Sequence, residues 1–536
     1  MIPVLNMNMT TPKALRSRLF THLEGIPLIA SVLALHDHDV FDIFKQQDCV
    51  SIKNLAARLD ANEGYLNVSF RLMASQGWMH REFKHDSPHY CMTAKGRKAL
   101  RNLEVWNGLE DWIRVTKDLR HFTLEELGGL DGDMLCRHIS SLTLHEATIS
   151  IDDVEQQMLA HKEGLICGVL LVNLGMKGLL DTPELHLPEE WGAVGLDGAT
   201  YALWEHLGWI FPTAQSYRFT ELGDFYRKRA AAYGVTVSYL QTFSWLPKLL
   251  FGAGDQLWNK PADVVDEIHV DRTMNVWGSG GAHGTYFNKI DEVVIEIFNQ
   301  PLDQQPRGIC DMGCGNGALL EHLYDVVKNH TLRGEHLDDH PLLVVGADFN
   351  NAALVATAET LGAAGLDFHC VHGDIGDPAE LAHTLRSEFD VELANMLNVR
   401  SFLDHNRIFV EPKGNFSQRE PLGTGAYAFR GRRVSCAEVE QNLLEHLSSW
   451  KPYIEKYGLL VIELHTIRPS VASENLGRTS ITAYDGTHGY TDQYIVELDV
   501  FQAIAEEAGL HSVERFRSRF PDSDLATVSI HLLRGK

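Results

Sequence analysis

The run Asp311-Met312-Gly313-Cys314-Gly315-Asn316-Gly317 has residue types and spacing that suit a nucleotide-like ligand. An apolar lead-in ends at Cys310 and a helical pattern follows from Ala318, so the segment predicts a strand, a glycine turn and a helix. Glycine accepts the backbone angles of such a turn and lets the main chain approach a ligand closely. Because no Lys, Ser or Thr follows Gly317, a phosphate loop is excluded.

The spacing acid-x-Gly-x-Gly-x-Gly also differs from the Gly-x-Gly-x-x-Gly of dinucleotide-binding folds. It resembles the first motif of class I S-adenosylmethionine (SAM)-dependent methyltransferases. The resemblance implies that Asp311, Gly313, Gly315 and Gly317 contact SAM.

Two later strands end in residues that fit the same cofactor. The apolar stretch from Leu342 ends at Asp348, whose carboxylate can accept both ribose hydroxyls or cap the helix that follows; the next residue, Phe349, is a further candidate contact. The strand from Phe368 ends in Gly373-Asp374-Ile375, which resembles the family's adenine-contacting motif. This resemblance implies that Asp374 bonds the exocyclic amine.

Further strands at residues 389–396 and 458–463 complete an alternation of strands and helices. The pattern predicts a doubly wound, Rossmann-like α/β sheet with ligands at the carboxyl ends of its strands. Asn395 then ends the fourth strand as a candidate cofactor contact. Asn398 and Arg400 either orient a thioester or carboxylate or cap a loop.

The N-terminal half predicts two winged-helix-like units. In the first, helices at Ser51–Leu59 and Glu63–Ser75 precede a small β-wing. A weaker copy follows, in which Gly208-Trp209 and Tyr217-x-Phe219-Thr220-x-x-Gly223 match Gly77-Trp78 and Tyr90-x-Met92-Thr93-x-x-Gly96. We therefore expect a winged-helix-like domain at 1–110, a helical connection and second winged-helix-like domain at 111–265, and a methyltransferase domain at 266–536. Many small-molecule methyltransferases dimerise through such N-terminal domains, which favours a homodimer.

Composition limits the class of partner. The formal net charge of -25 argues against nucleic acid, although Arg16, Arg18, Lys95, Arg97 and Lys98 could form a local basic patch. No apolar run appears long enough to cross a bilayer, and the N-terminus lacks a signal pattern, so we expect a cytoplasmic protein without membrane contact. The eight cysteines are scattered, which fits a reducing compartment, and Cys310 and Cys314 are expected to be packing residues.

Residues 269–287 are rich in glycine, histidine and aromatic side chains. We expect a loop that folds over the cofactor, with Tyr286 and Phe287 in contact with it; the alternative is a packed interdomain loop.

Two segments, 275–283 (NVWGSGGAH) and 484–494 (YDGTHGYTDQY), resemble C-methyltransferases from loading modules of bacterial polyketide assembly lines. Together with the glycine turn, the resemblance covers roughly the last half of the chain. It implies methylation of a carbon between a thioester and an acidifying group, on an acyl chain held by a carrier protein; from the residues alone, the substrate is either a free small molecule or a carrier-bound acyl chain. Some of these enzymes require a metal ion.

Methylation at carbon needs a base and a group that stabilises the enolate. Glu463 and His465 end the fifth strand and would share one face if that strand continues, so both are catalytic candidates, with His465 preferred; Glu463 could instead cap a helix or pair with a cation. His488 is a third candidate. His465, His488 and Gln493 could ligate one divalent metal, and the alternative is a metal-free histidine base beneath a polar lid.

Two other functions remain open from the sequence. An O-methyltransferase for a natural-product phenol also combines winged helices with this sheet. A winged-helix regulator could use the same domain to sense SAM.

Overall fold

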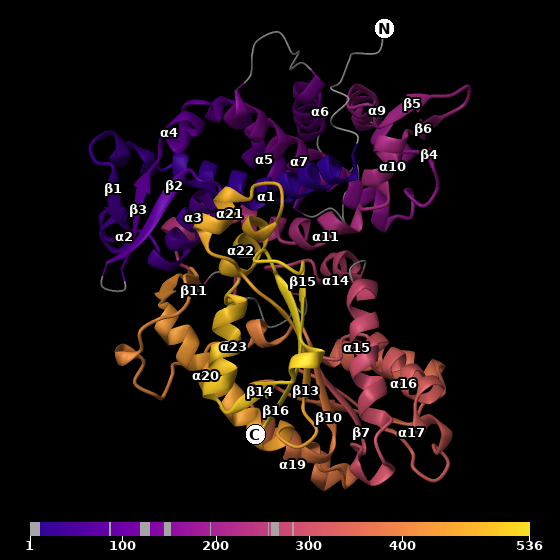
Figure 1. The fold of residues 1–536 in the computed structure, drawn as a ribbon. Helices are drawn as coiled ribbons and strands as arrows, with labels where there is room; N and C mark the ends of the chain where they lie inside the picture. The colour runs from indigo at the N-terminus through magenta and orange to yellow at the C-terminus, as the bar shows by residue number, and fades with distance from the viewer. Residues whose placement is uncertain are drawn as a thin grey trace. The chain divides into compact units, whose positions relative to one another are not determined.

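The computed structural model describes residues 11–84, 87–117, 129–143, 152–192, 194–255, 257–258, 267–280 and 283–535. The chain forms two compact units, each described below by itself (Figure 1). The N-terminal unit consists of Met1–Ala282, Ala426–Arg433 and Arg468–Thr491; the sheet unit consists of His283–Gly425, Val434–Ile467 and Asp492–Lys536. Two segments from the C-terminal half therefore belong to the N-terminal unit.

The sheet unit is built on a mixed sheet in the order β14-β16-β13-β10-β7-β8-β9, with β15 paired to β16 (Figure 1). Its elements are α15 (His283–Phe298), β7 (Gly308–Met312), α16 (Ala318–His330), α17 (Leu332–Glu335), β8 (Leu343–Asp348), α18 (Asn351–Ala363), β9 (Phe368–His372), α19 (Pro378–Phe389), β10 (Leu397–Ser401), α20 (Cys436–Ile454), β13 (Leu459–Leu464), α23 (Leu498–Glu507), β14 (Leu510–Ser512), β15 (Ser518–Phe520) and β16 (Val528–Gly535). The five strands from β13 to β9 are parallel, as predicted. The antiparallel pairing of β16 with β13 was not predicted.

Helices cover the sheet on both faces, as in other doubly wound folds. Helices α15, α16 and α18 contact one another in series, and α19, α20 and α23 form a second series. Strands β7, β10 and β13 are fully or almost fully buried, which explains their continuous apolar sequences.

The fourth strand lies further along the chain than predicted. Residues 389–396 do not form it: Phe389 ends α19, Asp390 has a left-handed φ of 55°, and Leu393–Asn395 is a 3-10 turn. The strand is β10, Leu397–Ser401, which pairs with both β7 and β13. An apolar stretch cannot by itself separate a helix end from the strand that follows it, which explains the shift.

The N-terminal unit contains both predicted winged-helix repeats, with three-stranded sheets in the equivalent orders β1-β3-β2 and β4-β6-β5. Its first repeat comprises α1 (Pro12–His36), β1 (Cys49–Ser51), α2 (Ile52–Leu59), α3 (Glu63–Ser75), β2 (Met79–Lys84), β3 (Ser87–Met92) and α4 (Ala94–Arg101), followed by α5 (Leu109–Thr116) and α6 (Gly129–Thr143). The second comprises α7 (Asp153–Met176), β4 (Glu184–Leu185), α8 (Glu189–Gly192), α9 (Leu196–His206), β5 (Ile210–Pro212), β6 (Tyr217–Phe219) and α10 (Glu221–Arg227). The remaining elements are α11 (Ala231–Val237), α12 (Leu240–Ser244), α13 (Leu246–Phe251), α14 (Arg272–Gly280), β11 (Tyr427–Phe429), β12 (Arg432–Val434), α21 (Pro469–Glu474) and α22 (Ile481–Gly489).

Two cysteines that are distant in sequence form a disulfide in the first repeat. Cys49 on β1 lies directly opposite Cys91 on β3 in the antiparallel register, and the pair is bonded. This bond was not predicted, because a sequence separation of 42 residues hides the pairing of the two cysteines. Cys310 and Cys314 are free and buried, as expected for packing residues.

Helices α1 and α7 are long and apolar enough to cross a membrane, a property that the sequence analysis missed. Within the described residues, 83% and 89% of their apolar windows are buried inside the protein. Each helix contacts the other along its length in the core of the N-terminal unit. Such burial is typical of core helices, for which an apolar surface on all sides is required.

Two buried glutamates on these helices have opposite environments. Glu163 on α7 accepts hydrogen bonds from Arg18 and lies 3.2 Å from His22 Nε2; although burial opposes ionisation, Arg18 and His22 hold the pKa of Glu163 well below its usual range. Glu24 on α1 accepts from the hydroxyl of Thr482 at 3.1 Å, and burial raises the pKa of Glu24 to about 8. At neutral pH, Glu163 is therefore charged and Glu24 is mostly protonated.

These environments predict unequal effects of the same substitution. Glu163→Gln leaves the Arg18 guanidinium without its counter-charge and should lower the free energy of unfolding by about 3 kcal/mol at pH 7. Glu24→Gln replaces an acid that is already neutral and should change the free energy of unfolding by less than about 1 kcal/mol. Denaturant unfolding at pH 7 measures both, and equal losses would contradict the assignment.

The pH dependence has opposite signs at the two positions. The stabilisation from Glu163 is present above its unfolded pKa and is lost as the pH falls, because its folded pKa is lowered. The stabilisation from Glu24 is complete below its unfolded pKa and is lost as the pH rises through about 8, because its folded pKa is raised. In a plot of the free energy of unfolding against pH, Glu163→Gln should remove the loss at low pH that comes from Glu163. Glu24→Gln should remove the loss above pH about 8 that comes from Glu24.

Candidate functional site

The glycine turn has the backbone conformation that the sequence predicts. Strand β7 carries Asp311 to the carboxyl edge of the sheet, and Gly313, Gly315 and Gly317 follow with φ angles of 82°, 58° and 78°. The amide of Gly313 donates to the carbonyl of Ala347 at 2.8 Å, which fixes the turn against β8. Helix α16 begins at Ala318, so the strand, turn and helix are confirmed.

Asp348 ends β8 beside this turn. Its Oδ2 accepts from the amide of Gly315 at 3.1 Å, and its Oδ1 accepts from the amide of Asn350 at 2.8 Å. The cap of α18 is Asn350, so Asp348 does not have that alternative role. The neighbouring Phe349 is 61% exposed. It is therefore accessible to a ligand that binds at this edge of the sheet.

The third cofactor motif lies against the second. The amide of Gly373 donates to the carbonyl of Asp348 at 3.0 Å, and Asp374 Oδ1 accepts from the amide of Gly376 at 2.7 Å. Ile375 is buried, and its carbonyl accepts from Trp450 Nε1 at 2.7 Å. The ends of β7, β8 and β9 thus form one continuous edge.

Asp311 lies beneath the turn and is only 2% exposed. Burial, with a further contribution from Asp348, raises the pKa of Asp311 to about 7. Its Oδ1 has no hydrogen-bond partner among the residues that the structure describes. A buried acid with an unsatisfied oxygen fits a cationic ligand such as SAM, which carries an ammonium and a sulfonium group.

Asn395 lies at the opposite edge of the sheet, so its prediction as a cofactor contact is wrong. Its carbonyl accepts from the amide of Arg307, which precedes β7, and its side chain lies 3.3 Å from Lys456 Nζ. The misplaced fourth strand caused the error, because Asn395 precedes β10 instead of following it.

The segment expected to be a loop over the cofactor is helical where it is described, in α14 and α15. Tyr286 on α15 lies 6.0 Å from Phe402 and 5.2 Å from Phe520 between ring centroids, so it lies near the carboxyl end of β10. Phe287 stacks on His322 of α16 at 4.6 Å. Tyr286 therefore remains a candidate contact, whereas Phe287 packs between helices.

A histidine that the sequence analysis missed pairs with Glu463 at the same edge. His405 lies in the 3-10 turn Asp404–Asn406 after β10, and its Nδ1 bonds the Oε1 of Glu463 near the end of β13. The side chains are 6% and 2% exposed, and Glu463 Oε2 has no hydrogen-bond partner within the described part of the chain. The signal was present in Phe402-Leu403-Asp404-His405, but the expected fourth strand ended nine residues earlier.

The turn that carries His405 packs directly on the glycine turn. A Cβ added to Gly313 would lie 2.8 Å from Leu403 Cδ2, at the end of a flexible side chain, so the two turns are in direct contact. The left-handed φ of Gly313 independently requires glycine. The turn that carries His405 and the glycine turn are therefore neighbours at the same edge of the sheet.

Buried polar contacts hold this turn on α20. Asp404 Oδ1 accepts from Arg400 Nη1 at 2.5 Å and lies 2.9 Å from His446 Nε2. Arg407 Nε donates to Asn442 at 2.6 Å. Arg400 is fully buried, with its guanidinium 3.9 Å from the centre of the Trp450 ring, so it supports the turn and does not orient a substrate as the sequence analysis suggested.

His465 is not placed to act as a base or a metal ligand, which corrects both predictions. Its Nδ1 lies 3.2 Å from the carbonyl of Val496, and its Nε2 lies 2.6 Å from Ser529 Oγ. Burial, reinforced by His531, lowers the pKa of His465 to about 3. Strand β13 ends at Leu464, and the next residue turns into the sheet instead of toward a ligand.

The other predicted metal ligands lie in different units. His488 belongs to α22 of the N-terminal unit, where its Nδ1 lies 2.8 Å from the carbonyl of Tyr484, and Gln493 belongs to the sheet unit. In the described ranges, no group of three or more His, Cys, Asp or Glu side chains is arranged to hold a metal ion. Because both nitrogens of His465 are engaged, the predicted ligand set does not fit a metal.

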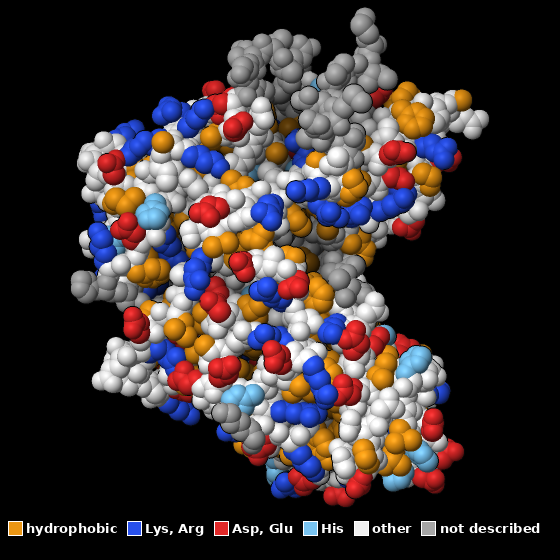
Figure 2. All heavy atoms as spheres, viewed as in Figure 1, with side chains coloured by type: hydrophobic (Ala, Val, Ile, Leu, Met, Phe, Trp, Pro, Cys, Tyr) orange, Lys and Arg blue, Asp and Glu red, His pale blue; other side chains and the backbone are white. Residues whose placement is uncertain are grey.

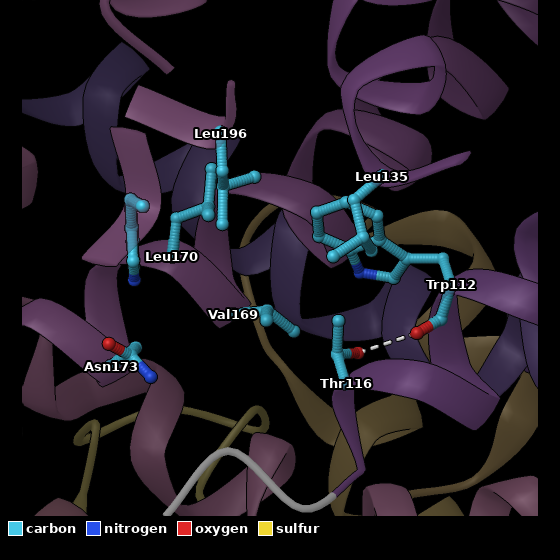
Figure 3. Close-up of a pocket in the computed structure, with 8 residues that line it drawn as sticks. Trp112, Thr116, Leu135, Val169, Leu170, Asn173 and Leu196 are labelled. Carbon is cyan, nitrogen blue, oxygen red and sulfur yellow. Dashed lines mark hydrogen bonds between the residues drawn. The ribbon is translucent and has the colours of Figure 1, made fainter. Parts of the chain in front are cut away.

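A small cavity in the N-terminal unit is not a cofactor site. It measures about 10 Å³, room for about one water, and lies among apolar side chains including Trp112, Val169 and Leu196 (Figure 3). The Thr116 hydroxyl near it donates to the carbonyl of Trp112 at 2.7 Å.

Comparison with known proteins gives three domain matches. Residues 15–81 match the AprA N-terminal domain, residues 163–253 the AprA winged helix domain, and residues 267–531 the AprA MT2-like domain. No curated protein sequence matches the chain.

Solved structures with a similar fold include an O-methyltransferase family 2 protein from Planctomyces limnophilus in complex with apigenin, at 12% identity and a TM-score of 0.38, covering 96% of this chain and 94% of that one. An O-methyltransferase family protein from Burkholderia thailandensis matches at 13% identity and a TM-score of 0.38, covering 72% and 99%. DszA carbon methyltransferase matches at 13% identity and a TM-score of 0.32, covering 82% and 93%. Because the identities and TM-scores of these structures are low, the assignment of the chain to a protein family rests on the domain matches and the site.

The buried acid beneath the glycine turn predicts a pH-dependent affinity for SAM. If only ionised Asp311 pairs with the cation, a pKa of about 7 makes binding roughly tenfold weaker at pH 6 than at pH 8. Isothermal titration calorimetry should show this slope, and Asp311→Asn should remove it. Methylthioadenosine, which lacks both cationic groups, is the matched control and should bind equally at both pH values; an unchanged slope in Asp311→Asn would rule out this residue.

Proposed function

Because the chain belongs to the SAM-dependent methyltransferases with an AprA MT2-like domain, we propose that it methylates an acidic carbon of a small acyl or keto substrate. The observation that supports this best is the His405–Glu463 pair, which lies beside the glycine turn at the carboxyl edge of the sheet. We further propose a role in natural-product biosynthesis, with the substrate free or bound to a carrier.

Glu463 determines which nitrogen of His405 acts. Because a carboxylate only accepts, the bonded Nδ1 carries the proton and Nε2 carries the lone pair. In the proposed reaction, Nε2 removes the proton from the acceptor carbon, and Glu463 stabilises the imidazolium that forms. SAM, when bound, supplies an electrophilic methyl group on sulfur.

Burial strengthens this arrangement. His405 and Glu463 are both almost inaccessible to water, so their interaction is weakly screened. The contacts of Asp404 and Arg407 with α20 fix the backbone on either side of His405. Because the base is already held in place, less entropy is lost when the reacting groups are oriented.

Carbon is favoured over oxygen by the resemblance of 275–283 and 484–494 to C-methyltransferases. The same histidine could also deprotonate a phenol, so O-methylation is the alternative outcome of the test below.

A DNA-binding regulator is disfavoured by the first winged helix. Its helix α3, in the position of a recognition helix, would have to enter the major groove, but residues 64–75 are all buried and contact α21, α22 and β11. Lys and Arg side chains gather on part of the N-terminal unit in Figure 2, but this surface excludes the buried face of α3. The helix equivalent to α3 in the second repeat, α9, carries Asp197 and Glu205.

The proposal predicts that His405→Gln lowers kcat by roughly 10²–10⁴-fold and leaves the affinity for SAM unchanged. Glu463→Gln should also lower kcat, because the neutral amide stabilises the imidazolium less well. The assay follows methyl-labelled SAM with malonyl, methylmalonyl, 2-keto acid and phenolic acceptors, and carbon NMR locates the label.

His465→Asn is the matched control, since it alters a buried histidine outside the proposed chemistry. It should lower the thermal midpoint while the folded enzyme keeps its kcat within about threefold. The base assignment fails if His405→Gln stays near the wild-type rate, and label on oxygen would replace the carbon proposal with O-methylation.

A further inference from the structure

The first helices of the two winged-helix repeats share a motif. Helix α1 contains His22-Leu23-Glu24-Gly25, and α7 contains His161-Lys162-Glu163-Gly164. The motif extends the sequence match between the wings to the start of each repeat. Together with the equivalent strand orders, it identifies the N-terminal unit as an internal duplication.

The two wings repeat the same hydrogen bonds. Thr93 Oγ1 donates to the carbonyl of Gly77 at 2.8 Å and accepts from the amide of Gly96 at 3.0 Å. Thr220 Oγ1 donates to the carbonyl of Gly208 at 2.7 Å and accepts from the amide of Gly223 at 3.0 Å. The agreement extends to the φ angles of Gly77 and Gly208, which are 72° and 70°.

The repeated motifs meet where α1 crosses α7. A Cβ on Gly25 would lie 2.5 Å from the Cα of His161, and a Cβ on Gly164 would lie 2.3 Å from the Cα of His22. Each glycine therefore packs on the histidine of the other repeat. Such reciprocity is the signature of a two-fold interface between identical chains.

The two halves differ in what their equivalent glutamates hold. Glu163 is ion-paired with Arg18 and lies 3.2 Å from His22 Nε2, whereas Glu24 bonds Thr482 of α22, a helix that is present once in the chain. The same helix is anchored to the first repeat by the ion pair of Arg71 with Asp485, at 2.8 Å. A single helix can occupy only one of two equivalent positions, so the repeats have specialised.

We propose that the N-terminal unit is the single-chain equivalent of a two-fold dimer and that the protein is a monomer. The apolar helix that one winged-helix repeat would bury against a second copy is buried here against the other repeat, since α1 and α7 cover each other. These two helices are therefore already covered within one chain, although the sequence favours a homodimer.

Sedimentation equilibrium of the full-length protein, from low micromolar to near-millimolar concentration, tests the proposal directly. The expected mass is that of one chain, 60.1 kDa, throughout this range. A species of twice that mass, stable on dilution, would overturn it.

Three glycine variants test the internal two-fold contact. Gly25→Ala and Gly164→Ala should each lower the thermal midpoint by at least about 5 °C, because both added methyl groups meet backbone atoms. Gly198→Ala is the control: this glycine also lies in a helix, has no atom within 4 Å of the added Cβ, and should not lower the midpoint. A loss in only one of the two motif variants would contradict a reciprocal contact.

Discussion

The close approach of Leu403 to Gly313 is the contact on which the site depends. Leu403 Cδ2 would lie 2.8 Å from a Cβ at Gly313, and the left-handed backbone there requires glycine. Through this contact the turn after β7 and the turn after β10 have one fixed relation. The groups that would bind the cofactor and the histidine that would remove a proton are positioned by the same few atoms.

Helix α20 holds the turn after β10 in this position. Its residues Asn442 and His446 lie one turn apart and contact the polar groups on either side of His405. Burying an arginine and an aspartate in this way is costly unless both are paired, so the cluster tolerates few alternative arrangements. These buried side chains thus limit the motion of His405, the proposed base.

Short sequence motifs were enough to predict much of the fold. The glycine turn, the acid after β8 and the Gly-Asp-Ile after β9 each follow a buried strand, and their place at the carboxyl edge follows from parallel pairing. The two wings were predicted from their shared Gly-Trp and Tyr-x-x-Thr-x-x-Gly patterns, and the structure shows that Thr93 and Thr220 of these patterns cap the helices that follow. The proposed base, His405, was not predictable, because its pairing with Glu463 spans 58 residues and the strand before it was misplaced. His465 was misjudged because a residue at a strand end can turn inward, and only its contacts with Val496 and Ser529 reveal that it does.

The duplication also changes how substitutions act on the protein. In a dimer of identical chains, one altered codon changes both sides of the two-fold axis, so a residue that suits one side must be tolerated on the other. Here the two sides are encoded separately. Arg18 could therefore be acquired beside Glu163 without placing a second arginine beside Glu24, and the position of Glu24 was left available to hold α22. With both halves in one chain, the two sides of a symmetric interface can therefore differ from each other.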